Sequence, residues 1–263
     1  MKVGFIGCGN MGAALITAIA KDKQTKLYIF DTNKEKAEGI ASVSGAEIMS
    51  AEDIVKAVDI LFLAVKPNVI SAVLSSLSEA MSQNPELTVI SMAAGVKLAA
   101  LEEVAPGAKL IRIMPNTSVA VGSGVTAYAT GGNVTEADEA AFLDVMKFTG
   151  ICDKIPEGLI DAESAIAGSG PAFAYMFIDA LADGGVLCGL PRDKAITYAA
   201  AMLEGAAKTL LKTGEHPSVL KDRVCSPGGS TIEGVAALEA GGFRAALTSA
   251  VLATCEKAKK LGK

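Results

Sequence analysis

A short polar loop near the C-terminus carries residue types with which proteins hold small anions. It reads Cys-Ser-Pro-Gly-Gly-Ser-Thr from Cys225 to Thr231 and interrupts a region whose pattern is otherwise helical. A Pro-Gly-Gly turn before a helix leaves consecutive backbone N–H groups free, and such groups bind carboxylate or phosphate. The Thr231 hydroxyl can donate or accept a hydrogen bond there. Ordinary helix capping explains the same residues, so both interpretations are open.

A glycine motif at the N-terminus has the spacing of a dinucleotide-binding loop. Gly7, Gly9 and Gly12 form Gly-x-Gly-x-x-Gly directly after an apolar run and at the start of a helical pattern. The first glycine of such a motif makes a tight turn, the second lets the backbone approach a pyrophosphate, and the third allows close helix–strand packing. Asp31 ends the next apolar run, roughly twenty residues further on, as the fingerprint requires. The pattern predicts binding of NAD or NADP.

The residues around Asp31 leave the choice between the two dinucleotides open. A carboxylate at this position favours the ribose 2′-hydroxyl of NAD and repels the 2′-phosphate of NADP. Thr32, Asn33 and Lys34 follow at once and can donate to that phosphate if Asp31 turns aside.

Three further loops are expected at the same edge of the sheet. Residues 64–67 (Ala-Val-Lys-Pro), 91–95 and 114–117 (Met-Pro-Asn-Thr) each follow an apolar run. Open α/β sheets bind ligands at the carboxyl ends of their strands. Lys66 can neutralise phosphate, but a solvated loop lysine explains it equally well. Asn116 can bind a carboxamide such as that of nicotinamide, although Pro-Asn-Thr is also ordinary turn chemistry.

Other functional classes are disfavoured by what the sequence lacks. Five scattered cysteines without Cys-x-x-Cys spacing predict free thiols, not disulfides or a zinc site. A single histidine, His216, nearly excludes a Ser-His-Asp triad. The net charge of −5 argues against nucleic acid. Glycines and Asn10 interrupt the apolar N-terminus and no other run is long enough for a bilayer, so we expect a cytoplasmic protein with no membrane partner.

The elements that would position these residues alternate along the first half of the chain. Short, continuously apolar runs are typical of parallel strands buried on both faces, and helical patterns separate them. Repeated βα units predict a doubly wound parallel sheet with right-handed crossovers. The expected strands are 2–6, 27–30, 60–65, 87–92 and 110–114, with 125–129 and 152–155 extending the sheet edge, and the expected helices are 9–21, 34–43, 52–58, 69–81, 98–104 and 136–148.

From about Ile160 the strand pattern stops. The expected helices are then 171–187, 193–212, 218–224, 231–239 and 243–261. The first of them is apolar on nearly every side, which is typical of a buried helix. So few helices can hardly bury it alone, and we expect a homodimer with interleaved helices. The fold class predicted is α/β, with an N-terminal Rossmann domain over 1–160 and an all-helical dimerisation domain over 161–263.

Four segments of this chain together resemble the pyrroline-5-carboxylate reductase family, and a fifth joins them in the same order. The four are 4–11 (Gly-Phe-Ile-Gly-Cys-Gly-Asn-Met), 64–67, 114–117 and 222–232 (Asp-Arg-Val-Cys-Ser-Pro-Gly-Gly-Ser-Thr-Ile). The fifth is Gly-Ser-Gly-Pro-Ala-Phe at 168–173. The resemblance extends over essentially the whole chain, and the Pro-Gly-Gly-x-Thr loop is its most specific part.

The resemblance implies the last reaction of proline biosynthesis. Reduced nicotinamide, as NADPH or alternatively NADH, would give a hydride to the C=N carbon of 1-pyrroline-5-carboxylate, yielding L-proline. The helical domain would bind the substrate, with its carboxylate on the backbone N–H groups of Gly228, Gly229, Ser230 and Thr231, together with Ser226. The Thr231 hydroxyl would hydrogen-bond the imine nitrogen, and the final proton is left to Thr231 or solvent.

The motifs and the resemblance together also imply cofactor contacts and an assembly. The assembly is a homodimer, or a larger ring of dimers, in which the loop of one subunit completes a site on the nucleotide domain of its partner. Residues 49–52 (Met-Ser-Ala-Glu) lack an Asn that many relatives use near the adenosine ribose, and Thr32 stands where Arg is frequent, so the choice between NADP and NAD stays open while the reaction does not. Ser230 stands where relatives often have Thr, and its smaller hydroxyl should still serve. The expected cofactor contacts are Gly7, Gly9, Asn10, Met11, Gly12, Asp31, Thr32, Asn33, Lys34, Ala64, Val65, Lys66, Pro67, Ala93 and Asn116.

Two alternatives are weaker. A β-hydroxyacid dehydrogenase also joins a Rossmann domain to a helical one, but it uses a lysine near the start of the helical domain. Here no lysine occurs between Lys154 and Lys194. A dinucleotide-binding regulatory protein without turnover would explain the glycine motif but not the second anion-binding loop.

Overall fold

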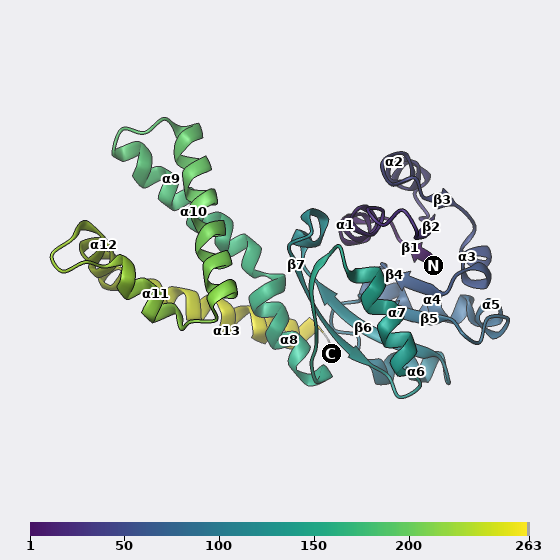
Figure 1. The fold of residues 1–263 in the computed structure, drawn as a ribbon. Helices are drawn as coiled ribbons and strands as arrows, with labels where there is room; N and C mark the ends of the chain where they lie inside the picture. The colour runs from purple at the N-terminus through teal and green to yellow at the C-terminus, as the bar shows by residue number, and fades with distance from the viewer. Residues whose placement is uncertain (262–263) are drawn as a thin grey trace. The chain divides into compact units, whose positions relative to one another are not determined.

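A computed structural model describes residues 1–261, which divide into two compact units (Figure 1). The first unit holds residues 1–169 together with residues 254–261, and the second holds residues 170–253. The first is a sheet covered by helices, and the second is helical throughout. The α/β fold class with a following helical region is therefore confirmed.

The sheet of the first unit has the strand order of a Rossmann fold. Among the described residues it has eight strands in the order β3-β2-β1-β4-β5-β6-β7-β8, and every neighbouring pair is parallel except β6 and β7. The central order with β1 next to β4 creates the switch point at which such sheets bind dinucleotides. The strands are β1 (Lys2–Ile6), β2 (Lys26–Phe30), β3 (Glu47–Ile48), β4 (Ile60–Leu63), β5 (Thr88–Ser91), β6 (Lys109–Pro115), β7 (Gly124–Thr130) and β8 (Gly150–Lys154).

The sequence predicts a parallel sheet extended at its edge by 125–129, and in the structure this strand, β7, runs antiparallel to β6. Pro115 at the end of β6 lies opposite Thr126 of β7. The two strands are joined only by residues 116–123, part of which forms the short 3-10 helix η2 (Thr117–Val121). A parallel pair needs a crossover of about a dozen residues or more, so this connection enforces an antiparallel return.

Helices cover both faces of the sheet and bury a core on each. On one face α1 (Asn10–Ile19), α2 (Lys34–Ser44) and α7 (Glu136–Met146) pack against side chains that include the stacked rings of Phe5 and Phe62. The other face is covered by α3 (Ala51–Ala57), α4 (Ile70–Ser76), α5 (Ser78–Ser82), α6 (Leu98–Val104) and α8 (Ile160–Glu163). Three short segments connect these elements: η1 (Pro67–Val69), η3 (Glu157–Leu159) and the π-helical η4 (Ser164–Gly168).

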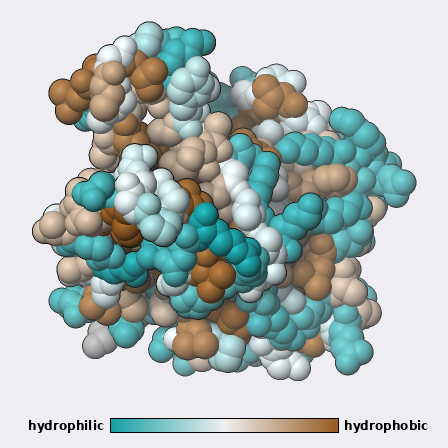
Figure 2. Space-filling model, turned by 60° about the vertical axis from the view of Figure 1, so that its left-hand side comes forward, coloured by the Kyte–Doolittle hydropathy of each residue, from teal (hydrophilic) through white to brown (hydrophobic). Residues whose placement is uncertain are grey.

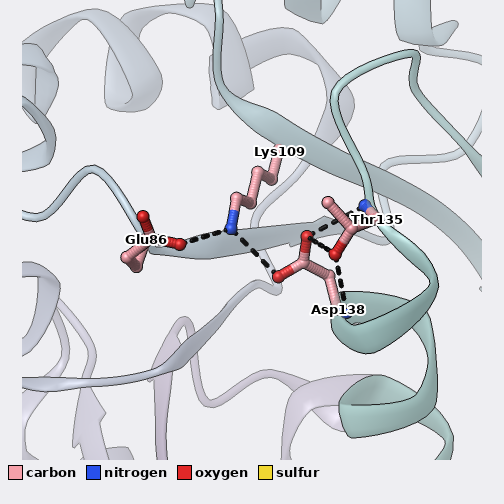
Figure 3. A network of polar contacts seen from close by, with 4 residues as sticks. All are labelled: Glu86, Lys109, Thr135 and Asp138. Atoms are coloured by element: carbon pink, nitrogen blue, oxygen red, sulfur yellow. Dashed lines mark hydrogen bonds and ion pairs between the residues drawn. The ribbon is translucent and has the colours of Figure 1, made fainter.

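The start of α7 is fixed by a capping box and an ion-pair network (Figure 3). The Thr135 hydroxyl accepts from the backbone N–H of Asp138, and the Asp138 carboxylate accepts from the N–H of Thr135. Lys109 lies 2.7 Å from Glu86 and 3.1 Å from Asp138. Hydrogen bonds to these two carboxylates raise the pKa of Lys109 above its usual range. The network ties the helix to the first residue of β6.

The second unit exposes much apolar surface. It consists of α9 (Gly170–Leu187), α10 (Arg192–Thr213), α11 (Pro217–Val224), α12 (Ser230–Ala240) and most of α13 (Phe243–Leu261). Helix α9 buries Ala182, but the exposed fractions of Tyr175, Met176 and Leu187 are 65%, 73% and 89%. Brown apolar patches are visible among the hydrophilic surface in Figure 2. In the single chain, much of α9 is therefore exposed, although the sequence predicts that this helix is buried.

Candidate functional site

The glycine loop between β1 and α1 has the tight turn that a dinucleotide-binding loop needs. Gly7 adopts a positive φ of 106°, and its N–H donates to the Phe30 carbonyl at 2.7 Å. A side chain at Gly7 would overlap the Ala64 carbonyl, and one at Gly12 would overlap the Gly7 carbonyl. Both positions therefore require glycine for close packing.

Gly9 is not required by packing within the chain. Nothing in residues 1–261 lies within 4 Å of where its side chain would begin. It is the N-cap of α1, and within the described residues no side chain caps that helix. The first turn also has no acidic residue, so the helix start at Asn10, which is exposed, and Met11, which is half-buried, presents a positive dipole. Open space above Gly9 and free N–H groups fit a pyrophosphate. The residues present therefore fit a dinucleotide.

Asp31 is held in place by two backbone groups. Its Oδ2 accepts from the N–H of Cys8 at 2.6 Å, and its Oδ1 accepts from the N–H of Asn33 at 2.8 Å. The Asn33 side chain caps α2 by accepting from the N–H of Lys36 at 3.1 Å. The carboxylate thus ties the glycine loop to the start of α2, and Thr32, Asn33 and Lys34 remain exposed beside it.

The thiol of Cys8 lies inside this loop. Burial, with a smaller contribution from the charge of Asp31, raises the pKa of Cys8 to about 11. The thiol is therefore neutral at physiological pH, and it adds no charge to the loop.

The loops after β4, β5 and β6 reach the same edge of the sheet. Ile6 is level with Leu63 in the register, Leu63 is level with Ser91, and Ser91 is level with Arg112, beyond which β6 runs on to Pro115. The structure thereby brings residues 7–12, 31–34, 64–67, Ala93 and Asn116 to one edge. Lys66 and Pro67 are exposed there, Ala64 and Val65 are half-buried, and Ala93 is buried.

Asn116 is buried, and backbone groups occupy both ends of its amide. The exposed fraction of the residue is 7%. Its Oδ1 accepts from the N–H of Val125 at 3.2 Å, and its Nδ2 donates to the Ala167 carbonyl at 2.9 Å. Asn116 therefore already has a structural task at the position where the sequence suggests a ligand for nicotinamide.

The loop between α11 and α12, in the second unit, carries the residues that the sequence suggests for anion binding. Gly228 has a positive φ of 69°, the N–H of Gly229 donates to the Ser226 carbonyl at 3.0 Å, and a side chain at Gly229 would overlap the Ser226 hydroxyl. Gly229 is the N-cap of α12, and no side chain of the described residues caps that helix. Ser226, Ser230 and Thr231 are exposed at this end. Free N–H groups and exposed hydroxyls can hold a carboxylate.

Two charged residues of the first unit lie outside every motif found in the sequence and were not predicted from it. Arg112 is buried, with its Nη1 3.0 Å from Glu157 and its Nη2 3.5 Å from Asp161. Its position inside the apolar run 110–114 is the sequence feature from which a buried, ion-paired arginine could have been predicted. Within residues 1–261, neither carboxyl oxygen of Glu163 has a hydrogen-bond partner, and burial, followed by the charge of Asp153, raises the pKa of Glu163 to about 7. Among the described residues no group of three or more His, Cys, Asp or Glu could hold a metal ion.

The fold and the glycine loop define a Rossmann-type dinucleotide-binding protein joined to a helical unit. Residues 157–261 match the family model described as pyrroline-5-carboxylate reductase dimerisation. Residues 2–95 match the model described as NADP oxidoreductase coenzyme F420-dependent.

Relatives over the full length identify the family. The Escherichia coli K12 pyrroline-5-carboxylate reductase is 40% identical, with 100% of this chain and 98% of that protein covered. Human pyrroline-5-carboxylate reductase 2 is 42% identical, with 99% and 84% covered. The crystal structure of Plasmodium falciparum pyrroline carboxylate reductase with NADP bound is 33% identical, with a TM-score of 0.89 and 100% and 98% covered. This chain belongs to the pyrroline-5-carboxylate reductase family.

Proposed function

We propose that this chain reduces 1-pyrroline-5-carboxylate to L-proline with a reduced nicotinamide dinucleotide, NADPH or alternatively NADH. The observation that carries the proposal is the 40% identity with the Escherichia coli enzyme over the full length of both proteins. The exposed, uncapped N-termini of α1 and α12 supply two anion-binding loops, one for each reactant. A reductase needs both, whereas a protein that only senses a dinucleotide needs one.

The first unit binds and orients the dinucleotide. N–H groups of the loop from Gly7 to Gly12 hold the pyrophosphate, as in other Rossmann folds. Thr32, Asn33 and Lys34 face the adenosine ribose, with Asp31 fixed behind them. Residues 64–67 and Ala93 line the nicotinamide half. The bound dinucleotide supplies the hydride.

The helical unit holds the substrate. The N–H groups of Gly228, Ser230 and Thr231, with the Ser226 hydroxyl, bind the substrate carboxylate. The Gly229 N–H, which the sequence also suggested for this role, donates to the Ser226 carbonyl instead. The Thr231 hydroxyl donates a hydrogen bond to the imine nitrogen and thereby orients the C=N bond for attack. A protonated imine is the better hydride acceptor, so Thr231 or a solvent molecule bonded to it delivers the proton to that nitrogen.

We assign the substrate-binding and dimerisation role to residues 161–263, although the compact helical unit itself begins at Gly170. The apolar helical stretch Glu157–Leu187 is long enough to cross a bilayer by length and composition, and only 11% of its most apolar window is buried. It lies inside the matched dimerisation region, so a second copy of the chain covers it. The protein works in the cytoplasm as a homodimer or a ring of dimers, and the loop of one subunit completes the site of its partner.

Turnover of purified protein tests the proposal. We expect loss of absorbance at the nicotinamide band when the protein is mixed with NADPH and 1-pyrroline-5-carboxylate, with L-proline as product. Dissociation constants for NADPH and NADH, measured on the same sample, decide the preferred dinucleotide. A protein that binds NADPH but never oxidises it with this substrate would contradict the assignment.

A further inference from the structure

The side chain of Asn116 takes the place of a backbone acceptor at the carboxyl end of β6. Its own N–H donates to the Val125 carbonyl at 3.1 Å, as the next rung of the β6–β7 ladder requires. The Val125 N–H, which in a regular ladder would donate to the Asn116 backbone carbonyl, donates to the Asn116 side-chain oxygen at 3.2 Å. The amide is thereby fixed, with its nitrogen turned toward Ala167.

The Ala167 carbonyl needs an external donor because of the residue four positions later. In an α-helix this carbonyl would accept from the N–H of residue 171. Residue 171 is Pro171, which has no N–H and whose ring crowds the carbonyl four residues before it. The Asn116 amide nitrogen, 2.9 Å from the Ala167 oxygen, provides the donor that Pro171 lacks.

The backbone around Ala167 is widened in a way that also points to a constrained connection. Residues Ser164–Gly168 form a π-helix, and the N–H of Ser169 donates to the Ser164 carbonyl at 2.9 Å. A side chain at Gly168 would begin 2.8 Å from the Ser164 hydroxyl, so this turn is closely packed. π-Helical turns inside helices are frequent at functional sites. The connection leads directly into α9, where the second unit begins.

The geometry points to Asn116 as a positioning residue for the reduction. Its amide restrains the π-helical connection Ser164–Gly168 at the edge of the sheet that carries the glycine loop, and α9 continues from that connection. Asn116 acts through Ala167 and makes no contact with the nicotinamide carboxamide. This inference rests on the reductase activity proposed above, and it replaces the ligand role that the Pro-Asn-Thr sequence suggests.

Asn116→Asp isolates the donor, because the carboxylate keeps an acceptor for the Val125 N–H but turns a charged oxygen toward the Ala167 carbonyl. We expect kcat to fall about 10–100-fold, since misplacement of reacting groups by about 1 Å costs on that order. The KM for 1-pyrroline-5-carboxylate and the dissociation constant for NADPH should stay within about threefold. Asn84→Asp is the matched control, because the Asn84 amide also donates to backbone carbonyls, those of Val55 and Val58, far along the chain from this loop. It should lower stability and leave kcat within about twofold.

Pro171→Ala is the decisive second variant, because it returns an N–H to position 171. In that background Asn116→Asp should cost at most about one third of its effect in the wild-type chain, as a shared hydrogen-bond role predicts. The loss should also be the same when reduced 3-acetylpyridine adenine dinucleotide phosphate, which lacks the carboxamide nitrogen, replaces NADPH. An undiminished loss in the Pro171→Ala background, or a smaller loss with the analogue, would show direct contact with the cofactor and overturn the inference.

Hydrogen exchange of the connection gives a reading that does not depend on turnover. In Asn116→Asp, amides of residues 164–169 should exchange at least about tenfold faster, because the restraint on the Ala167 carbonyl is gone. Unchanged exchange would also overturn the inference. Absence of turnover in the wild-type protein would count against the reductase function itself, and the exchange result would then still report on the restraint.

Discussion

At the scale of single residues, the two loops proposed to bind anions contain some residues that the fold needs and others that the proposed chemistry needs. Gly7 and Gly12 are glycines because neighbouring backbone atoms exclude a side chain. Gly9 has free space around it, and Thr231 is exposed at the start of α12. Substitutions at Gly9 and Thr231 should therefore affect ligand binding and chemistry more than folding.

Thr231→Ala should lower kcat by about 10–100-fold, as expected for loss of one positioned hydrogen bond. NADPH binding should be unchanged, because the proposed dinucleotide contacts lie in the other unit. Steady-state kinetics and fluorescence titration with NADPH measure the two quantities. Thr231→Ser keeps the hydroxyl and is the control. Equal turnover of the alanine and wild-type proteins would remove Thr231 from the mechanism.

Gly9→Val should abolish NADPH binding by filling the space that the backbone leaves for the pyrophosphate. It should cost on the order of 1 kcal/mol of stability, because valine is a poor N-cap. Gly12→Val, which would collide with the Gly7 carbonyl, should destabilise the protein more. Calorimetric titration with NADPH and urea unfolding separate the two effects. Wild-type affinity in Gly9→Val would refute the assignment of this loop.

Glu163 should make stability fall as the pH rises. Its pKa is about 7 in the folded chain against an ordinary value of 4.5, so the folded protein holds this proton more tightly than the unfolded one. The protonated group costs nothing below about pH 4.5, and the penalty for ionisation grows through about pH 7 and is complete above it. Glu163→Gln should remove this fall and be more stable than wild type at pH 8 by roughly 1–2 kcal/mol, because solvent screens part of the charge of a half-buried group. Urea unfolding at pH 5 and pH 8 measures it, and parallel pH profiles for the two proteins would contradict the prediction.

At the scale of elements, the features that depend on residues close in sequence could be predicted, whereas the features that depend on residues distant in sequence could not. Continuous apolar runs predicted the central parallel strands, because burial on both faces removes any alternation. The short β3 was missed, since Glu47 and Ile48 are both exposed and carry no pattern. The direction of β7 follows from the short connection 116–123 rather than from the strand itself. The raised pKa of Glu163 depends on packing of the chain around it, and no local motif marks such a group.

The capping box of α7 offers a test of one element. Thr135→Ala removes the acceptor for the Asp138 N–H and should lower the free energy of unfolding by about 1 kcal/mol. Glu86→Gln is the control, because its side chain is 85% exposed and an exposed ion pair contributes about 0–1 kcal/mol. Urea unfolding of both variants measures the difference. A larger loss for Glu86→Gln would mean that the ion pair, not the cap, holds this helix end.

At the scale of the whole molecule, the helical unit exposes apolar surface that a second subunit would bury. Exposed apolar side chains of α9 contribute to the hydrophobic fraction of the chain, which is 51%. Association through such a surface follows the same hydrophobic driving force as folding. The matched dimerisation region covers all five helices of the unit.

Light scattering at micromolar concentration should give at least a dimeric mass for the wild-type protein. Met176→Glu places a charge on the exposed apolar face of α9 and should raise the dimer dissociation constant by at least about tenfold, with activity lost in parallel. Lys56→Glu, an equally drastic change of charge on the exposed part of α3, should leave mass and activity unchanged. A monomeric wild-type protein with full turnover would exclude a site shared between subunits.

The order of the strands also governs what happens when many chains are crowded together. The sheet ends in β3, which has only two residues, and in β8, whose exposed Asp153 and Lys154 carry charges. Short or charged borders are poor templates for β-pairing between molecules. The protein can therefore expose an apolar helical surface for self-association without exposing a strand that would pair with other copies into fibrils. Specific assembly and resistance to amyloid are in this way handled by different parts of one chain.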